Sequence, residues 1–215
     1  MSAFDRKDPY NTEIKTICCS EAMGTKGESN RQHIIDVADD LFYQKGYNQT
    51  SFTDIAEASE IPRGNFYYYF KTKDEILTAV IEHRVNIMKS MLQMWDEEYS
   101  TPLEKLKRFA NMLRIEEKNT CQYGCPLGSL TIELGKAQQE LQAQAKGMFD
   151  VFKVWLIQQF TELGYPDKAD YLAMQLMSRL QGIVVMAHAY HDESFIKPST
   201  DEIDKWIDEL ARKVA

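Results

Sequence analysis

The sequence predicts an all-α protein in which an N-terminal helix-turn-helix domain, residues 28–88, is joined rigidly to a larger helical domain, residues 89–215. Apolar residues recur at helical spacing through most of the chain, and no stretch shows the period of two that marks a half-buried strand. Helix start signals, in which Ser or Thr is followed three residues later by an acidic or amide residue, separate several of these stretches. With 215 residues, of which 44% are apolar, the chain can bury a sizeable core.

The N-terminal segment, residues 1–27, is expected to be a disordered tail, because it shows no sustained periodicity and ends in the linker-like run 24–27. Its opening residues are polar and charged, which argues against a secretory signal, and no apolar run in the chain is long enough to span a membrane. Four cysteines without regular pairing are typical of reduced thiols. These features predict a cytoplasmic protein without a membrane partner.

Two helices are expected to flank the helix-turn-helix. The first is predicted over residues 30–45, with Ser29 and Gln32 as a capping box and Gly46 after its end. The other is predicted from about residue 74 to residue 99 and contains no flexible linker. Because this helix crosses the boundary between the two domains, movement of its far end would swing the helix-turn-helix.

The helix-turn-helix itself is predicted over residues 51–70, with Ser51 and Asp54 as an approximate capping box at its start. The segment 59–61 has the length of its turn, and Pro62 suits the first position of the second helix. Phe66 and Phe70 are the obvious core anchors of that helix, but the three consecutive tyrosines cannot all point inward, because successive helical positions lie about 100° apart. The groups suited to phosphates and base edges in a major groove are Arg63, Gly64, Asn65, Tyr67, Tyr68 and Tyr69. The alternative, a buried aromatic cluster, is preferred only for the two phenylalanines.

A longer pattern of residues identifies a family. Its positions are Arg31–Ala38, Leu41–Phe42, Gly46–Tyr47, Thr50, Thr53–Ala56, Arg63–Gly64 and Phe66–Asp74. In order and spacing this pattern closely resembles the DNA-binding domain of TetR/AcrR-family transcriptional repressors, although the family more often has a small and then an aliphatic residue at Asn65–Phe66. The resemblance implies a DNA-contacting set made of Thr50, Ser51, Thr53, Arg63, Gly64, Asn65, Tyr67, Tyr68, Tyr69 and Lys73. Lys73 and the tyrosine hydroxyls are expected mostly on phosphate.

The net charge of −8 is unfavourable for DNA binding, but the acidic residues are unevenly placed. Residues 26–73 hold six basic and seven acidic side chains, whereas residues 74–215 hold sixteen basic and twenty-two acidic ones. DNA affinity must therefore come from a few Lys and Arg side chains at specific positions and from helix N-termini, rather than from a broadly positive surface. An acidic body also disfavours loose binding to nucleic acid and to membranes.

The rest of the chain is predicted to be helical over residues 102–113, 126–135, 136–163, 166–190 and 200–214. Methionine and aromatic side chains are dense here. For any one of them, ordinary helical core is the better interpretation, but together they suit an apolar cavity between helices. The resemblance implies a regulatory ligand pocket. The residues predicted for this pocket or for a sensor are Met91, Trp95, Phe109, Met112, Cys121, Cys125, Phe152, Trp155 and Met177.

Cys125 immediately precedes Pro126 at a predicted helix N-terminus, where the helix dipole lowers the pKa of a thiol. The segment 121–129 resembles the Gly-Cys-Pro/Leu-Leu-Gly turn of a TetR subgroup, some of whose members sense electrophiles or oxidants through a cysteine. The alternative is a small buried residue in a tight turn. A zinc site would combine the two cysteines of this segment with His188 and His191, but the spacing is loose, and neither a metal nor a cofactor is predicted.

The function predicted from these features is that of a homodimeric transcriptional repressor. The resemblance implies that it binds palindromic operator DNA, that it dimerises through the last two long helices, and that a small apolar or electrophilic ligand releases it. The alternative is a helical small-molecule-binding protein or enzyme whose helix-turn-helix does not bind DNA. No paired carboxylates, nucleophile elbow, phosphate loop or metalloprotease motif supports catalysis, so an enzyme is not expected.

Overall fold

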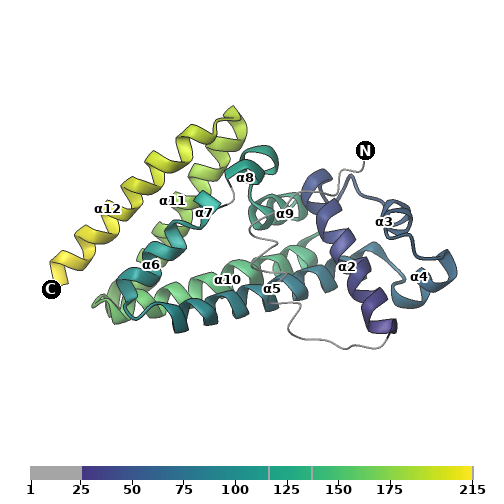
Figure 1. Cartoon of the computed structure of the whole chain (residues 1–215), viewed down its shortest axis with the longest axis horizontal. Helices are drawn as coiled ribbons and strands as arrows, with labels where there is room; N and C mark the ends of the chain where they lie inside the picture. The colour runs from purple at the N-terminus through teal and green to yellow at the C-terminus, as the bar shows by residue number, and fades with distance from the viewer. Residues whose placement is uncertain (1–25, 116, 137, 215) are drawn as a thin grey trace. The chain divides into compact units, whose positions relative to one another are not determined.

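The computed structural model describes residues 26–115, 117–136 and 138–214, and no strand occurs among them (Figure 1). The all-α prediction is therefore confirmed. None of the helices in these ranges is long and apolar enough to cross a membrane. Most of the predicted tail lies outside the described residues, but Lys26 and Gly27 are helical, so the expected tail is too long at its C-terminal end.

The described residues form two compact units. The N unit comprises residues 26–88 and 126–150, and the C unit comprises the described residues of 89–125 and 151–214. The chain passes from one unit to the other within α5 (Lys73–Glu98), after Cys125, and within α10 (Gln139–Glu162). The helix-turn-helix thus shares its unit with a segment that lies far from it in the sequence.

The N unit holds α2 (Lys26–Lys45), α3 (Phe52–Ala58), α4 (Arg63–Tyr69), α9 (Pro126–Leu134) and the first parts of α5 and α10. Helix α2 packs against α3 and against α9 (Figure 1). The core of the unit consists of side chains that recur at helical spacing, including Ile34, Ile35, Ala38, Phe42, Ile55, Phe66, Phe70, Ile76, Leu77 and Val80. These residues follow the predicted apolar stripes, so burial of those stripes fixes the orientation of each helix.

Helix α2 begins at Lys26, earlier than the predicted start at residue 30. The expected capping box of Ser29 and Gln32 is therefore wrong. The Gln32 amide donates to the Asp36 carboxylate at 2.8 Å, one turn further along the helix, instead of reaching back to Ser29. An i,i+4 hydrogen bond of this kind stabilises the interior of a helix. Ser29 and Gln32 therefore lie inside α2 and do not mark its start.

The C unit holds α6 (Pro102–Ala110), α7 (Met112–Ile115), α8 (Glu117–Tyr123), η1 (Pro166–Lys168), α11 (Ala169–Tyr190), η2 (Glu193–Phe195), α12 (Ile196–Val214) and the remaining parts of α5 and α10. Helix α11 packs against α8 and α12, and α12 also packs against α6 (Figure 1). Thr101 and Glu104 form a capping box at the start of α6, and these hydrogen bonds lower the pKa of Glu104.

Two boundaries in the C unit differ from the prediction. Helix α6 ends at Ala110 instead of residue 113, because the Asn111 side chain donates to the Lys107 carbonyl and to Asp204. Helix α12 begins at Ile196 instead of residue 200. Inside its first turns the Thr200 hydroxyl bonds to the Ile196 carbonyl at 3.1 Å, so the polar residues that suggested a cap lie within the helix.

Candidate DNA interface and regulatory core

The first helix of the helix-turn-helix is fixed at its start by Ser51 and Asp54. The Asp54 N–H donates to the Ser51 hydroxyl at 3.0 Å, and the Ser51 N–H donates to the Asp54 carboxylate at 2.7 Å. The same backbone and side-chain hydrogen bonds from Ser51 lower the pKa of Asp54. The turn then passes through Glu60, whose φ of 54° lies in the left-handed region. The predicted cap and turn are both present.

Helix α4 and the residue that follows it bury two phenylalanines and expose two tyrosines. Phe66 and Phe70 are buried, and the Phe66 ring meets the Phe52 ring edge-on with centroids 5.0 Å apart. In contrast, Tyr67 is 51% exposed and Tyr68 is 79% exposed. The prediction that the phenylalanines anchor the helix and that tyrosine rings face outward is therefore confirmed. Exposed tyrosines of this kind can donate to phosphate oxygens.

The exposed surface also includes small and polar residues of both helices. Gly64 and Asn65 of α4 are exposed, as are Ser51 and Thr53 at the start of α3. A methyl group added at Gly64 would meet no atom within 4 Å, so packing inside the protein does not explain the glycine. A backbone that can approach a ligand closely is a common reason for glycine at such a position.

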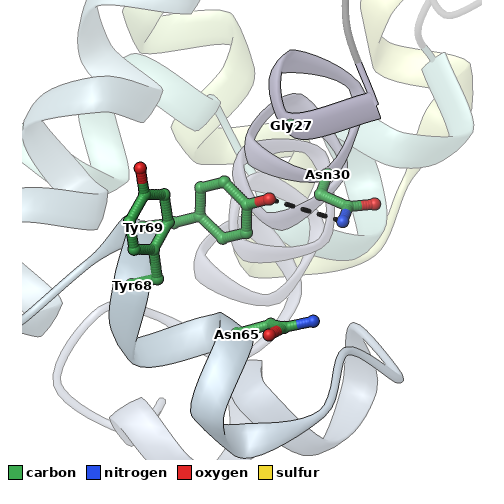
Figure 2. Close-up of a pocket in the computed structure, with 5 residues that line it drawn as sticks. All are labelled: Gly27, Asn30, Asn65, Tyr68 and Tyr69. Atoms are coloured by element: carbon green, nitrogen blue, oxygen red, sulfur yellow. Dashed lines mark hydrogen bonds between the residues drawn. The ribbon is translucent and has the colours of Figure 1, made fainter.

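A hollow of about 290 Å³ lies beside the exposed face of α4. It is lined by Gly27, Asn30, Asn65, Tyr68 and Tyr69 (Figure 2). The Tyr69 ring points toward Asn30, whose side-chain amide donates to the tyrosine hydroxyl at 3.5 Å (Figure 2). The hollow therefore extends the polar face of α4 onto the first turns of α2.

Two residues predicted to contact DNA hold the adjoining loop instead of forming part of the open surface. Thr50 is fully buried, and its hydroxyl donates to the Gly46 carbonyl at 2.8 Å, so the prediction that it faces DNA is wrong. The Lys73 ammonium donates to the carbonyls of Tyr47 and Thr50, both at 2.9 Å, and lies 4.1 Å from the centre of the Tyr47 ring. A contact between Lys73 and phosphate remains a prediction.

The same loop is tied to α9 and to the start of α5. Glu133 of α9 accepts hydrogen bonds from the backbone N–H groups of Tyr47 and Asn48. The Tyr47 hydroxyl donates to the Asp74 carboxylate; burial, together with this hydrogen bond, raises the pKa of Tyr47. The tyrosine thus stays a protonated donor, and the loop is held from both sides.

In the C unit, four of the residues predicted for a ligand pocket form an aromatic cluster. The Trp95 and Trp155 rings lie 6.0 Å apart, and Phe109 contacts Phe152 at 5.1 Å and Trp155 at 6.2 Å, measured between ring centroids. All four are buried. Their tilted and edge-on geometry is the arrangement that aromatic side chains prefer. Met91 is also buried, whereas Met112 and Met177 are partly exposed.

The two cysteines of the segment 121–129 have different surroundings. Cys121 is buried, and burial raises the pKa of its thiol, with a further contribution from Glu193. Cys125 is partly exposed and accepts a hydrogen bond of 3.3 Å from the Gln181 amide. His188 faces the Cys121 carbonyl oxygen at 3.0 Å rather than its sulfur. Among the described residues no group of three His, Cys, Asp or Glu side chains is placed to hold a metal, so nothing supports the zinc alternative.

One face of α11 exposes a row of apolar side chains. They are Tyr171, Met174, Val185, Met186 and Tyr190, all more than 40% exposed. Gly182 lies on the same exposed face, and an added methyl group there would meet no atom within 4 Å. The exposed residues Ser178 and Arg179 lie between the two ends of this row. Exposed apolar side chains of this kind are suited to protein association.

Comparison with known proteins agrees with this geometry. A family model described as bacterial regulatory proteins, tetR family, matches residues 34–80, and one described as the C-terminal domain of LmrA/YxaF-like transcriptional regulators matches residues 102–202. The chain belongs to the TetR family. This TetR-family protein is therefore a DNA-binding transcriptional regulator, and no observation favours the alternative of a helical enzyme or carrier.

Individual relatives of this TetR-family regulator cover most or part of its length. An uncharacterized HTH-type transcriptional regulator in the lacX 3′ region of Lactococcus lactis is 25% identical over 189 residues, which is 86% of this chain and 96% of the relative. The HTH-type transcriptional repressor DhaR of Mycobacterium sp. is 23% identical, over 59% of this chain and 61% of DhaR. The crystal structure of a TetR transcriptional regulator from Legionella pneumophila superposes with a TM-score of 0.74 at 26% identity, over 86% of this chain and 98% of that one.

In this TetR-family protein six of the predicted DNA-contacting residues are exposed, namely Ser51, Thr53, Gly64, Asn65, Tyr67 and Tyr68, whereas Thr50 is buried and Lys73 bonds to the adjoining loop. Sequence reasoning missed Gly27 and Asn30, which line the hollow beside α4 because α2 starts early. It also missed Glu133, whose partners lie 86 and 85 residues earlier. A carboxylate on an amphipathic helix gives no signal of a distant backbone partner, so only the fold reveals this residue.

Proposed function

We propose that the protein is a homodimeric repressor that binds a palindromic operator through α3 and α4 and leaves it when a small ligand occupies the C unit. The observation that carries the DNA-binding part is the division of α4 into a buried and an open face. Phe66 fixes the helix in the N unit, while Tyr67 and Tyr68 remain exposed beside Gly64. A helix held in this way can enter a major groove without losing its packing.

The contacts expected at the groove divide into two kinds. The hydroxyl of Tyr68, and that of Tyr69 beside Asn30, are suited to phosphates on either side of the groove. Arg63 and Asn65, in the first turn of α4, are of the residue types that pair with guanine and adenine edges. Phosphate contacts set affinity and its salt dependence, whereas base contacts set the sequence preference.

Repression and dimerisation rest on separate observations. DhaR is named as a repressor, and repression is the simplest consequence of a regulator that covers its operator. The exposed apolar face of α11 supports a two-fold dimer built on this helix and α12, because a second copy would cover it. A dimer also matches a palindromic site, since one small helix-turn-helix reads only half of it.

The aromatic cluster of the C unit is the proposed ligand site. Trp95, Phe109 and Trp155 would surround an apolar molecule on several sides. Its effect would travel to the N unit along the three connections of the chain, in α5, after Cys125 and in α10. Helix α9 follows the second connection and carries Glu133, which holds the loop before α3.

The test is binding to duplexes carrying the DNA upstream of the gene that encodes the protein, measured by fluorescence anisotropy over a range of salt concentrations. Tyr68→Phe should weaken binding to every sequence and lower the slope against salt, whereas Arg63→Ala should also relax base preference. Tyr171→Phe, an exposed tyrosine of α11, is the matched control. If selection from random duplexes by the wild-type protein enriches no sequence, the proposal fails.

A further inference from the structure

A buried glutamine on α10 lacks hydrogen-bond partners. Gln159 is fully buried, and neither its side-chain oxygen nor its nitrogen has a partner within the part of the chain that the structure describes. Buried amides are nearly always bonded, because desolvating one without a partner costs free energy. A buried carboxamide that is left open in this way indicates a missing hydrogen-bonding group.

Gln159 lies next to the aromatic cluster. On α10 it follows Phe152 and Trp155 at spacings of seven and four, so the three side chains share one face of the helix. Phe152 and Trp155 both contact Phe109, and all belong to the C unit. The next residue, Phe160, instead meets Trp206 of α12. The open carboxamide therefore borders the aromatic rings.

Several other polar groups at this cluster already have contacts within it. The Trp155 indole N–H donates to Asp96 at 3.0 Å, and Asp96 also pairs with Lys105 at 2.8 Å. The Arg108 guanidinium lies 4.5 Å from the centre of the Trp95 ring. An anionic ligand group would compete with the Trp95 ring for Arg108, and a cationic one would compete with Lys105 for Asp96. A carboxamide, in contrast, serves an uncharged group equally well as donor and as acceptor.

We infer that Gln159 is the polar contact of the ligand site, and that the ligand is an uncharged, largely aromatic molecule carrying a hydroxyl, carbonyl or amide group. This inference rests on the proposed function, and it adds the chemical class of the ligand. The aromatic rings receive the body of the molecule, and the carboxamide receives its polar group. The ligand thereby forms the hydrogen bonds that the rest of the protein does not provide to the Gln159 carboxamide.

Four naphthalene derivatives test this with the full-length protein: naphthalene, 2-naphthol, 2-naphthamide and 2-naphthoate. Binding is followed by quenching of tryptophan fluorescence, since Trp95 and Trp155 lie in the cluster. We expect the naphthol and the naphthamide to bind at least tenfold more tightly than naphthalene, and the anionic naphthoate to bind more weakly than the naphthamide. This order of affinities in the wild-type protein tests the proposed ligand class without any variant. Equal affinities for the four probes, or no binding by the uncharged ones, would overturn the inference.

The variant Gln159→Met keeps the length of the side chain and removes the carboxamide. It should abolish the preference for 2-naphthol and 2-naphthamide over naphthalene while raising thermal stability, and Gln158→Met, at an exposed position, should change neither. A preference that survives in Gln159→Met contradicts the inference. Operator binding is measured in parallel: its absence in the wild-type protein would refute the proposed repressor, whereas intact operator binding without probe selectivity would refute only the ligand class.

Discussion

Glu133 accepts a hydrogen bond of 3.0 Å from the backbone N–H of Tyr47, 86 residues earlier in the chain. Its other carboxylate oxygen accepts from the N–H of Asn48 at 2.7 Å. The adjoining Gly46 has a φ of 87°, and a methyl group added there would lie 3.2 Å from both oxygens. Two conditions therefore require glycine at this position: the left-handed backbone and the closeness of the carboxylate. The loop that leads into α3 is shaped around a residue of α9.

The variant Glu133→Ala should destabilise the N unit and weaken operator binding. It removes two charge-assisted hydrogen bonds, so we expect the free energy of unfolding to fall by about 1–3 kcal/mol. Urea denaturation measures the first effect and anisotropy with operator DNA the second. Glu140→Ala, at an exposed site on α10, is the control. An unchanged unfolding free energy would mean that the loop does not depend on α9.

The helix-turn-helix could be predicted from the sequence because its determinants are local. The Ser51–Asp54 capping box and the i,i+4 pair Phe66 and Phe70 depend only on residues a few positions apart. Thr50 failed for the opposite reason. Its hydroxyl meets the Gly46 carbonyl only four residues earlier, but the loop between them is held by Glu133 of the distant helix α9, which no local pattern reveals. The aromatic residues of the proposed ligand site were named from the sequence, but the open amide of Gln159 was not, because only the fold shows that no neighbouring group bonds to it.

Gly64→Ala separates a role in folding from a role in DNA binding. Since an added methyl group meets no atom within 4 Å, alanine should be accepted and should raise the free energy of unfolding, by about 0.5–1 kcal/mol if the position behaves as a helix interior. Operator affinity should nevertheless fall, because the methyl group would lie between α4 and the DNA. Gly147→Ala, also an open site but on α10, should leave affinity for DNA unchanged. Full operator affinity in Gly64→Ala would show that the backbone does not approach the duplex closely.

Val185→Asp tests the exposed face of α11. Val185 is 55% exposed, so the aspartate should not disturb folding of the single chain, but a carboxylate buried in a dimer without a partner is strongly unfavourable. Sedimentation velocity should show a monomer that retains its helical circular dichroism. Val154→Asp, on α10 and 68% exposed, should remain a dimer. A dimeric Val185→Asp would place the interface elsewhere, and loss of operator binding should accompany loss of the dimer.

The two cysteines should differ in reactivity and in pH dependence. Because burial raises the pKa of Cys121 above its ordinary value, its thiolate fraction at neutral pH is lower than that of a free cysteine, whose pKa is about 8.5. Iodoacetamide at pH 7 should therefore modify the partly exposed Cys125 first, and modification of Cys121 should rise only at a higher pH than that of a free cysteine. Peptide mass spectrometry after short exposures measures both rates. Equal rates at pH 7 would contradict the burial argument.

Operator binding by the alkylated protein tests whether modification of Cys125 acts as a signal. The residue is the last of the C unit before α9, and it accepts a hydrogen bond from Gln181 of α11, so an adduct would break that bond and strain the connection that leads to Glu133. We expect alkylated wild-type protein to release the operator and Cys125→Ser to keep it after the same treatment. Cys121→Ser should behave like the wild type. If the alkylated wild type still binds the operator, Cys125 is a structural residue of the turn, and occupation of the aromatic cluster by a reversible ligand is the better account of induction.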